Sequence, residues 1–200
     1  MHVWLPDVYQ GAPTPTTTFL AVGSKTAGFA LLCILARPFA HMAVPGAFMG
    51  DVLVWSFAIV AAATLLIGNL GALRQHNLKR LLGYSSIGQA GFILVFFTHI
   101  AAGNLVGYVT DYLVAYMLAT VAAFFAIAMV RTQRGSEEIS AFRGLGKTNP
   151  RTAFLITVAF ASLAGVPLTY GFLAKYNSFA MLVEASQYQS GLIWLLPVMI

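Results

Sequence analysis

Five stretches of this chain are apolar over a length that can cross a lipid bilayer. They run approximately over residues 16–37, 48–73, 81–100, 105–130 and 151–183, and a sixth, partial stretch covers residues 191–200. A crossing helix needs roughly 20 consecutive apolar residues, and within lipid every backbone polar group has to be paired inside the protein. We therefore expect an all-α integral membrane protein, folded as a polytopic bundle of transmembrane helices.

Composition supports this class and excludes a soluble enzyme. Hydrophobic residues make up 59% of the 200 residues and charged residues only 8%, whereas a soluble domain carries about 25% charged residues. We expect residues 1–200 to form a single transmembrane domain. The chain ends inside an apolar segment that is too short to cross, and its start lacks the pattern of a signal peptide. The sequence is therefore interpreted as a fragment of a longer protein.

The distribution of basic residues predicts the orientation of the helices. Eight of the eleven lysines and arginines lie in two connections, residues 74–80 and 131–151, whereas the connections on the opposite side hold only Arg37. Two crossings separate the two basic connections, so both should lie on one face. Lysine and arginine are enriched in cytoplasmic connections, and we expect both of these to be cytoplasmic.

Two lysines lie inside apolar stretches, Lys25 in the first and Lys175 in the fifth. Lys25 is about nine residues into its stretch, or roughly 13 Å at 1.5 Å per residue. A charge at bilayer depth costs at least a few kcal/mol and rarely persists without a use. Buried lysines can load and release a proton near neutral pH. With no intramembrane carboxylate seen beside them, the pair predicts ion translocation and favours protons over sodium.

The fifth stretch is too long for one straight helix at ordinary tilt. Its centre, residues 165–171, reads GVPLTYG and is a natural place for a helix to break. Freed backbone groups at that depth survive only against protein or a water-filled cavity. Broken helices with binding groups beside the break recur in ion-coupled transporters. We therefore expect a discontinuous helix, with Lys175 one turn after the break.

Each of these features also has a simpler interpretation. Lys25 could extend to an interface or pair with an unseen partner. Polar side chains within the stretches could extend a hydrated path or could serve only as hydrogen bonds between helices, which is their commoner role. These side chains are Asn69, Ser85, Ser86, Gln89, Tyr112, Tyr116 and Thr120.

No cofactor site is predicted within the chain. The single cysteine, Cys33, excludes an internal disulfide, a four-cysteine iron–sulfur site and a Cys-x-x-Cys pair. The four histidines are scattered without ligand spacing, and no Gly-x-Gly-x-x-Gly motif is present. We expect no metal, haem, flavin or NADH to bind here.

Three stretches resemble a known family: HVWLPDVYQGAPTPTTTFLAVGSKTAGF, NLKRLLGYSSIGQAGFILV and FRGLGKTNPRTAFLITVAFASLAGVPLTYGFLAKY. In order and spacing they closely resemble the proton-pumping, antiporter-like membrane subunits of respiratory complex I. Within that family they look most like the subunit N group of bacterial NADH:quinone oxidoreductase, called subunit 2 in mitochondria and chloroplasts. The resemblance covers essentially all 200 residues.

The resemblance implies roles for three lysines. Lys25, in the Gly-Ser-Lys stretch, would lie on a central hydrophilic axis of the membrane, and Lys175 would end the outer half-channel. Lys79, in the Asn-Leu-Lys-Arg stretch, would feed or stabilise the path by which protons enter, although a plain topology charge is at least as good an interpretation. The implied fold is an inverted-repeat, antiporter-like fold in which residues 48–200 begin the second repeat.

The resemblance also implies a function and partners. It predicts a proton-translocating subunit, coupled to electron transfer from NADH to quinone elsewhere in the complex. NADH, quinone, flavin and iron–sulfur clusters would belong to partner subunits. The expected partners are other membrane subunits of that complex, the lipid bilayer and protons, with no nucleic acid, in the bacterial inner (plasma) membrane. The family's intramembrane glutamate and a further lysine precede this segment, so we expect no complete catalytic site within it.

Two alternatives stay open. A subunit of a multisubunit cation/proton antiporter or of a membrane-bound hydrogenase would share these motifs. A purely structural membrane subunit is the other alternative. Two lysines at bilayer depth and a broken helix weigh against it, because packing alone needs neither.

Overall fold

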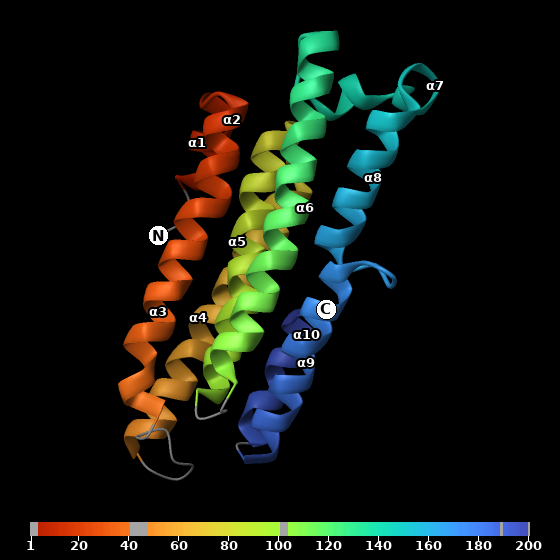
Figure 1. Cartoon of the computed structure of the whole chain (residues 1–200). Helices are drawn as coiled ribbons and strands as arrows, with labels where there is room; N and C mark the ends of the chain where they lie inside the picture. The colour runs from red at the N-terminus through yellow and green to blue at the C-terminus, as the bar shows by residue number, and fades with distance from the viewer. Residues whose placement is uncertain (1–3, 41–47, 101–103, 189, 200) are drawn as a thin grey trace.

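The computed structural model describes residues 4–40, 48–100, 104–188 and 190–199, and it confirms the all-helical class. The long helices lie side by side and nearly parallel (Figure 1). The described residues hold no β-strand, only an isolated bridge between Asn77 and Glu138. Residue 200, the last of the partial stretch, lies outside the described residues.

The helices follow one another along the chain with short connections. Their bounds are α1 (Leu5–Gly11), α2 (Thr14–Phe19), the π-helix η1 (Leu20–Ser24), α3 (Lys25–Ala40), α4 (Phe48–Leu73), α5 (Leu78–Phe96), the 3-10 helix η2 (Phe97–His99), α6 (Leu105–Arg134), the 3-10 helix η3 (Ile139–Phe142), α7 (Leu145–Thr148), α8 (Pro150–Ala164), α9 (Tyr170–Tyr188), the 3-10 helix η4 (Ser190–Leu195) and α10 (Leu196–Met199).

Four helical runs are long and apolar enough to cross a membrane. They are Thr14–Phe39, Phe48–Leu73, Leu78–His99 and Leu105–Arg134. The first joins α2, η1 and α3 without interruption, so Lys25 lies near the middle of its 26 residues. The chain therefore has the multi-pass, membrane-embedded architecture expected from its apolar stretches.

Helix α5 lies at the centre of the bundle and is the most buried of these runs. Asn77 caps its N-terminus by accepting hydrogen bonds from the backbone of Lys79 and Arg80. Helices α5 and α4 are in close backbone contact. A Cβ added at Gly68 would collide with the backbone of Gly88. Such close backbone contact supplies the van der Waals packing that holds helices together in lipid, where no hydrophobic force drives them together.

The two basic connections meet at one end of the bundle. The Leu78 amide donates to the Glu137 carbonyl at 3.0 Å, and the Ile139 amide donates to the His76 carbonyl at 2.9 Å. The same end carries α7 and the last turn of α6 (Figure 1). Both connections thus lie on the same face, as an even number of crossings between them requires.

The chain stops being helical between α8 and α9. Gly165, at φ 81°, ends α8, and its amide donates to the carbonyls of Ala161 and Ser162. The Val166 amide also reaches the Ala161 carbonyl at 2.9 Å. The bonds from Gly165 to Ser162 and from Val166 to Ala161 form a Schellman cap, which requires a left-handed residue at the position of Gly165. Helix α9 resumes at Tyr170 and continues alongside the bundle (Figure 1).

Candidate functional site

The Lys25 side chain points from its half-buried position towards α5 and α6. Its ammonium donates to the Ser86 carbonyl and lies 3.5 Å from the Tyr116 hydroxyl. It also lies 4.5 Å from the centroid of the Tyr116 ring, within the range of a cation–π contact. None of the ion pairs in the described part of the chain includes Lys25. The Lys25 ammonium is therefore contacted by a carbonyl, a hydroxyl and an aromatic ring.

A π-helical turn, η1, comes directly before Lys25. The Ser24 hydroxyl donates to the Leu20 carbonyl at 2.5 Å, and the Thr26 hydroxyl donates to the Val22 carbonyl at 2.9 Å. Single π-helical turns within α-helices are frequent at functional sites. Nothing in the apolar pattern of the sequence predicts this turn.

Ser86 and Tyr116 extend the polar surroundings of Lys25. Their hydroxyls lie 3.0 Å apart, and the Tyr9 hydroxyl lies 3.4 Å from that of Ser86. All three side chains are buried. Burial, and secondarily the nearby Tyr116, raises the pKa of the Tyr9 phenol well above its ordinary value, so Tyr9 stays protonated. These hydroxyls can each donate and accept a hydrogen bond.

A second polar group lies one turn away, between α5, α6 and α8. The Tyr112 hydroxyl donates to Gln89 Oε1, and Gln89 Nε2 donates to the Leu163 carbonyl at 2.9 Å. Tyr112 and Gln89 are both buried. A single amide thus joins a tyrosine of α6 to the last turn of α8.

Lys175 binds the C-terminal end of α8, where the last backbone carbonyls of that helix lie. Its ammonium donates to the Ala164 carbonyl at 3.1 Å and lies 4.6 Å from the centroid of the Phe92 ring. The last carbonyls of a helix carry partial negative charge and lack partners within the helix. At this end Leu163 is paired by Gln89 and Ala164 by Lys175, so side chains of the candidate site replace the missing backbone partners.

A cavity of about 10 Å³ lies between the two polar groups. Its lining includes Tyr116 from the Lys25 side, together with Gln89, Tyr112, Ser162 and Gly171. This volume is at the lower limit for holding one water molecule, and the lining offers the polar partners that a buried water needs. The residues between Lys25 and Lys175 therefore form a nearly continuous polar route through an apolar bundle.

Lys79 lies elsewhere, at the basic end of the bundle. It is only 1% exposed, and its ammonium pairs with Glu137 Oε1 at 3.0 Å and donates to the Ala12 carbonyl at 2.8 Å. The same carboxylate oxygen pairs with Arg131 at 2.9 Å. Lys79 thus ties the start of α5 to the connection after α6 and to the link between α1 and α2, an arrangement that favours a stabilising role.

The remaining predicted polar residues divide between those in the route and those outside it. Ser86, Gln89, Tyr112 and Tyr116 are brought together, and Thr120 is buried one turn beyond. Ser85 forms no side-chain hydrogen bond among the described residues, and Asn69 is exposed on α4.

The expectation that no carboxylate lies within a span was wrong. Asp111 lies in the second turn of α6, inside the run Leu105–Arg134, and its side chain is exposed. A charged residue within an apolar stretch is the sequence signal that could have identified Asp111. It faces away from the route, next to the buried Tyr112.

The site contains no candidate metal centre in the part of the chain that the structure describes, where no three His, Cys, Asp or Glu side chains gather. What the arrangement offers is two amines, each set on a carbonyl and an aromatic ring, with hydroxyls and an amide between them. Such groups can hold, pass and release protons.

Sequence comparison identifies relatives along the whole chain. The profile of a family described as "NADH:quinone oxidoreductase/Mrp antiporter, TM" matches residues 1–200. NADH-quinone oxidoreductase subunit N of Desulforamulus reducens is 44% identical over 92% of this chain and 37% of the relative. Subunit N 1 of Opitutus terrae is 42% identical over 94% of this chain and 36% of the relative. The chain thus spans less than two fifths of the length of these relatives.

Solved structures share the fold. A chain of respiratory complex I from Thermus thermophilus is 33% identical, with a TM-score of 0.73, and the match covers 99% of this chain and 41% of that one. A chain of a membrane-bound sulfane sulfur reductase, an archaeal respiratory membrane complex, is 26% identical with a TM-score of 0.77, covering 96% of this chain and 41% of that one.

Proposed function

Because the chain belongs to the transmembrane family shared by NADH:quinone oxidoreductases and Mrp antiporters, we propose that it forms part of a proton-translocating membrane subunit of NADH:quinone oxidoreductase. In this proposal the chain binds no cofactor. NADH, flavin, iron–sulfur clusters and quinone belong to partner subunits, and the chain takes part in moving protons across the membrane.

The observation that carries the proposal is the polar route between Lys25 and Lys175. It runs from the Lys25 ammonium through Ser86 and Tyr116, across the small cavity, and through Tyr112 and Gln89 to the carbonyls that end α8. Lys175 binds the last of these carbonyls. A structural subunit would need neither an unpaired amine at this depth nor a polar route between two of them.

In the proposed mechanism, the two lysines exchange a proton through the hydroxyls and a water in the cavity. Neither lysine is fixed as a cation by a carboxylate partner among the described residues. Two such amines are electrostatically coupled, so protonation of one disfavours protonation of the other. Lys25 would therefore release its proton as Lys175 accepts it, and Lys175 would release it outward.

The proposed orientation places both basic connections in the bacterial cytoplasm, following the excess of lysine and arginine there. Lys79 would then lie at the cytoplasmic end. Its buried ion pair with Glu137 favours a role in holding α1, α5 and the connection after α6 together, with proton entry near Lys79 as the alternative.

A second candidate function has support from one relative. The 26% identical chain belongs to a membrane-bound sulfane sulfur reductase, and the family description names Mrp antiporters as well. A respiratory complex with another electron donor, or a cation/proton antiporter complex, would use the same proton route. Genes beside the one for this protein discriminate: NADH dehydrogenase genes support the first candidate, and hydrogenase or antiporter genes support the second.

The proposal is tested in the full-length protein within its complex, reconstituted in vesicles. We expect Lys25→Ala to lower the number of protons pumped per electron while the complex still assembles. Lys25→Arg should pump equally poorly, because arginine stays protonated. Lys147→Ala is the matched control, since Lys147 is exposed on α7 at the basic end. Normal pumping by Lys25→Ala would overturn the proposal.

A further inference from the structure

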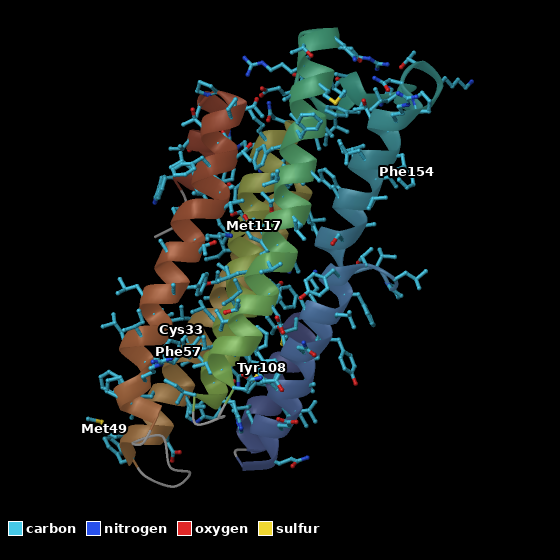
Figure 2. The ribbon with its side chains drawn as sticks, in the orientation of Figure 1. Cys33, Met49, Phe57, Tyr108, Met117 and Phe154 are labelled. Atoms are coloured by element: carbon cyan, nitrogen blue, oxygen red, sulfur yellow. The ribbon has the colours of Figure 1, made fainter. Side chains whose placement is uncertain are left out.

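An apolar groove of about 300 Å³ lies between α3 and α6 and plays no part in the proton route. Its lining comes from both helices: Thr26, Ala30, Cys33, Ile34 and Arg37 on α3, and Val106, Val109, Thr110, Leu113, Val114 and Met117 on α6. Figure 2 labels Cys33 on α3 and Met117 on α6. Apart from two threonines and Arg37, every lining side chain is apolar.

The groove has the length of one leaflet. Thr26 and Arg37 are eleven residues apart, which is about 16 Å along a helix, close to half of the roughly 30 Å hydrocarbon core of a bilayer. Val106 and Met117 on α6 are separated by the same number of residues. Arg37 lies in the last turn of α3, at the end of the bundle away from the basic connections (Figure 1). The groove thus runs from that interface to the level of Lys25.

Arg37 supplies a positive charge at one end of the groove. Its side chain is exposed, and among the described residues it forms no hydrogen bond or ion pair. The ion pairs among the described residues all join other side chains. A guanidinium in this position presents several N–H donors in the geometry that phosphate accepts.

We propose that the groove binds one anionic phospholipid, with its phosphate at Arg37 and an acyl chain along the apolar lining between α3 and α6. The charge at one end selects the anionic headgroup, and the leaflet-length apolar lining accommodates the chain. The lipid would come from the leaflet opposite the basic connections. A neutral lipid would gain the apolar contacts but not the attraction of Arg37.

The test uses the full-length protein in its complex, in vesicles that contain photoactivatable phosphatidylglycerol or phosphatidylcholine with the reactive group on the acyl chain. We expect phosphatidylglycerol to cross-link to peptides covering residues 26–37 and 106–117. Arg37→Gln should reduce this cross-linking roughly fivefold, the effect of one basic residue near a charged interface. Arg37→Lys should retain most of it, and Arg74→Gln, at the other end of the bundle, should change nothing.

Cys33 provides an independent readout, because it lines the groove and is the only cysteine of this segment. A bound acyl chain should slow its reaction with a lipid-soluble maleimide in phosphatidylglycerol relative to phosphatidylcholine, and Arg37→Gln should abolish the difference. Equal cross-linking by both lipids would overturn the proposal. So would a rate of Cys33 labelling that is the same in the two lipids.

Discussion

The Gln89 side chain donates a hydrogen bond of 2.9 Å to the carbonyl oxygen of Leu163. Through this bond, the most buried helix of the bundle holds the last turn of α8 at the point where that helix stops. The same amide accepts a hydrogen bond from Tyr112. A residue that couples the backbone break to the polar route is therefore a direct target for mutation.

Replacement of Gln89 by leucine should impair both pumping and stability. Gln89→Leu leaves the Tyr112 hydroxyl and the Leu163 carbonyl without partners, and each unpaired buried group costs about 1–3 kcal/mol. We expect fewer protons pumped per electron and a lower temperature of unfolding. Ser85→Ala, one turn earlier on the same helix, should leave both unchanged. Equal pumping by Gln89→Leu and the wild type would remove Gln89 from the route.

Gly165 should tolerate no side chain. Its φ of 81° is strained for any other residue, and a Cβ there would lie 2.8 Å from Cδ of Lys175. The left-handed conformation alone costs about 1–2 kcal/mol. We expect Gly165→Ala to unfold at a lower temperature and to pump less, because Lys175 is displaced from the Ala164 carbonyl.

A matched control for this change is Gly146→Ala. No atom lies within 4 Å of a Cβ built at Gly146, which has an ordinary helical conformation in α7. This variant should behave as the wild type does. If both alanine variants unfold at the same temperature, the break does not depend on a glycine.

Much of this architecture could be predicted from hydropathy and from the positions of helix-breaking glycines and prolines. The predicted stretch 48–73 has the same bounds as α4, and the non-helical segment falls within residues 165–171, where glycine and proline cluster. These features depend on where apolar residues, glycines and prolines follow one another in the sequence, so they can be recognised without the structure. The depth of Lys25 in its helical run follows in the same way.

The contacts of the site could not be predicted. Hydropathy does not indicate that Ser86, rather than Ser85, faces Tyr116, because that depends on how α5 is rotated against its neighbours. The π-helical turn before Lys25 leaves no mark in the apolar pattern. The pairing of Lys79 with Glu137 joins connections that are far apart in sequence, and only the packed bundle brings them together.

Removal of the Lys79 ammonium should affect stability more than transport. Lys79→Met breaks a buried ion pair, a change that costs up to about 3–5 kcal/mol, reduced here because Glu137 keeps Arg131. The control is Arg80→Met, whose pair with Asp7 is exposed and should matter little. Thermal unfolding and pumping are measured together. Lost pumping with unchanged stability would instead place Lys79 on the path by which protons enter.

The most direct test of the relay compares Lys25→Ala, Lys175→Ala and the double variant in reconstituted full-length complex. If one route joins the two lysines, each single variant stops the same flow, so the double variant should pump as many protons per electron as either single variant. If the lysines serve separate paths, the two losses will add in the double variant. Additive losses, or normal pumping by Lys175→Ala, would contradict a shared route.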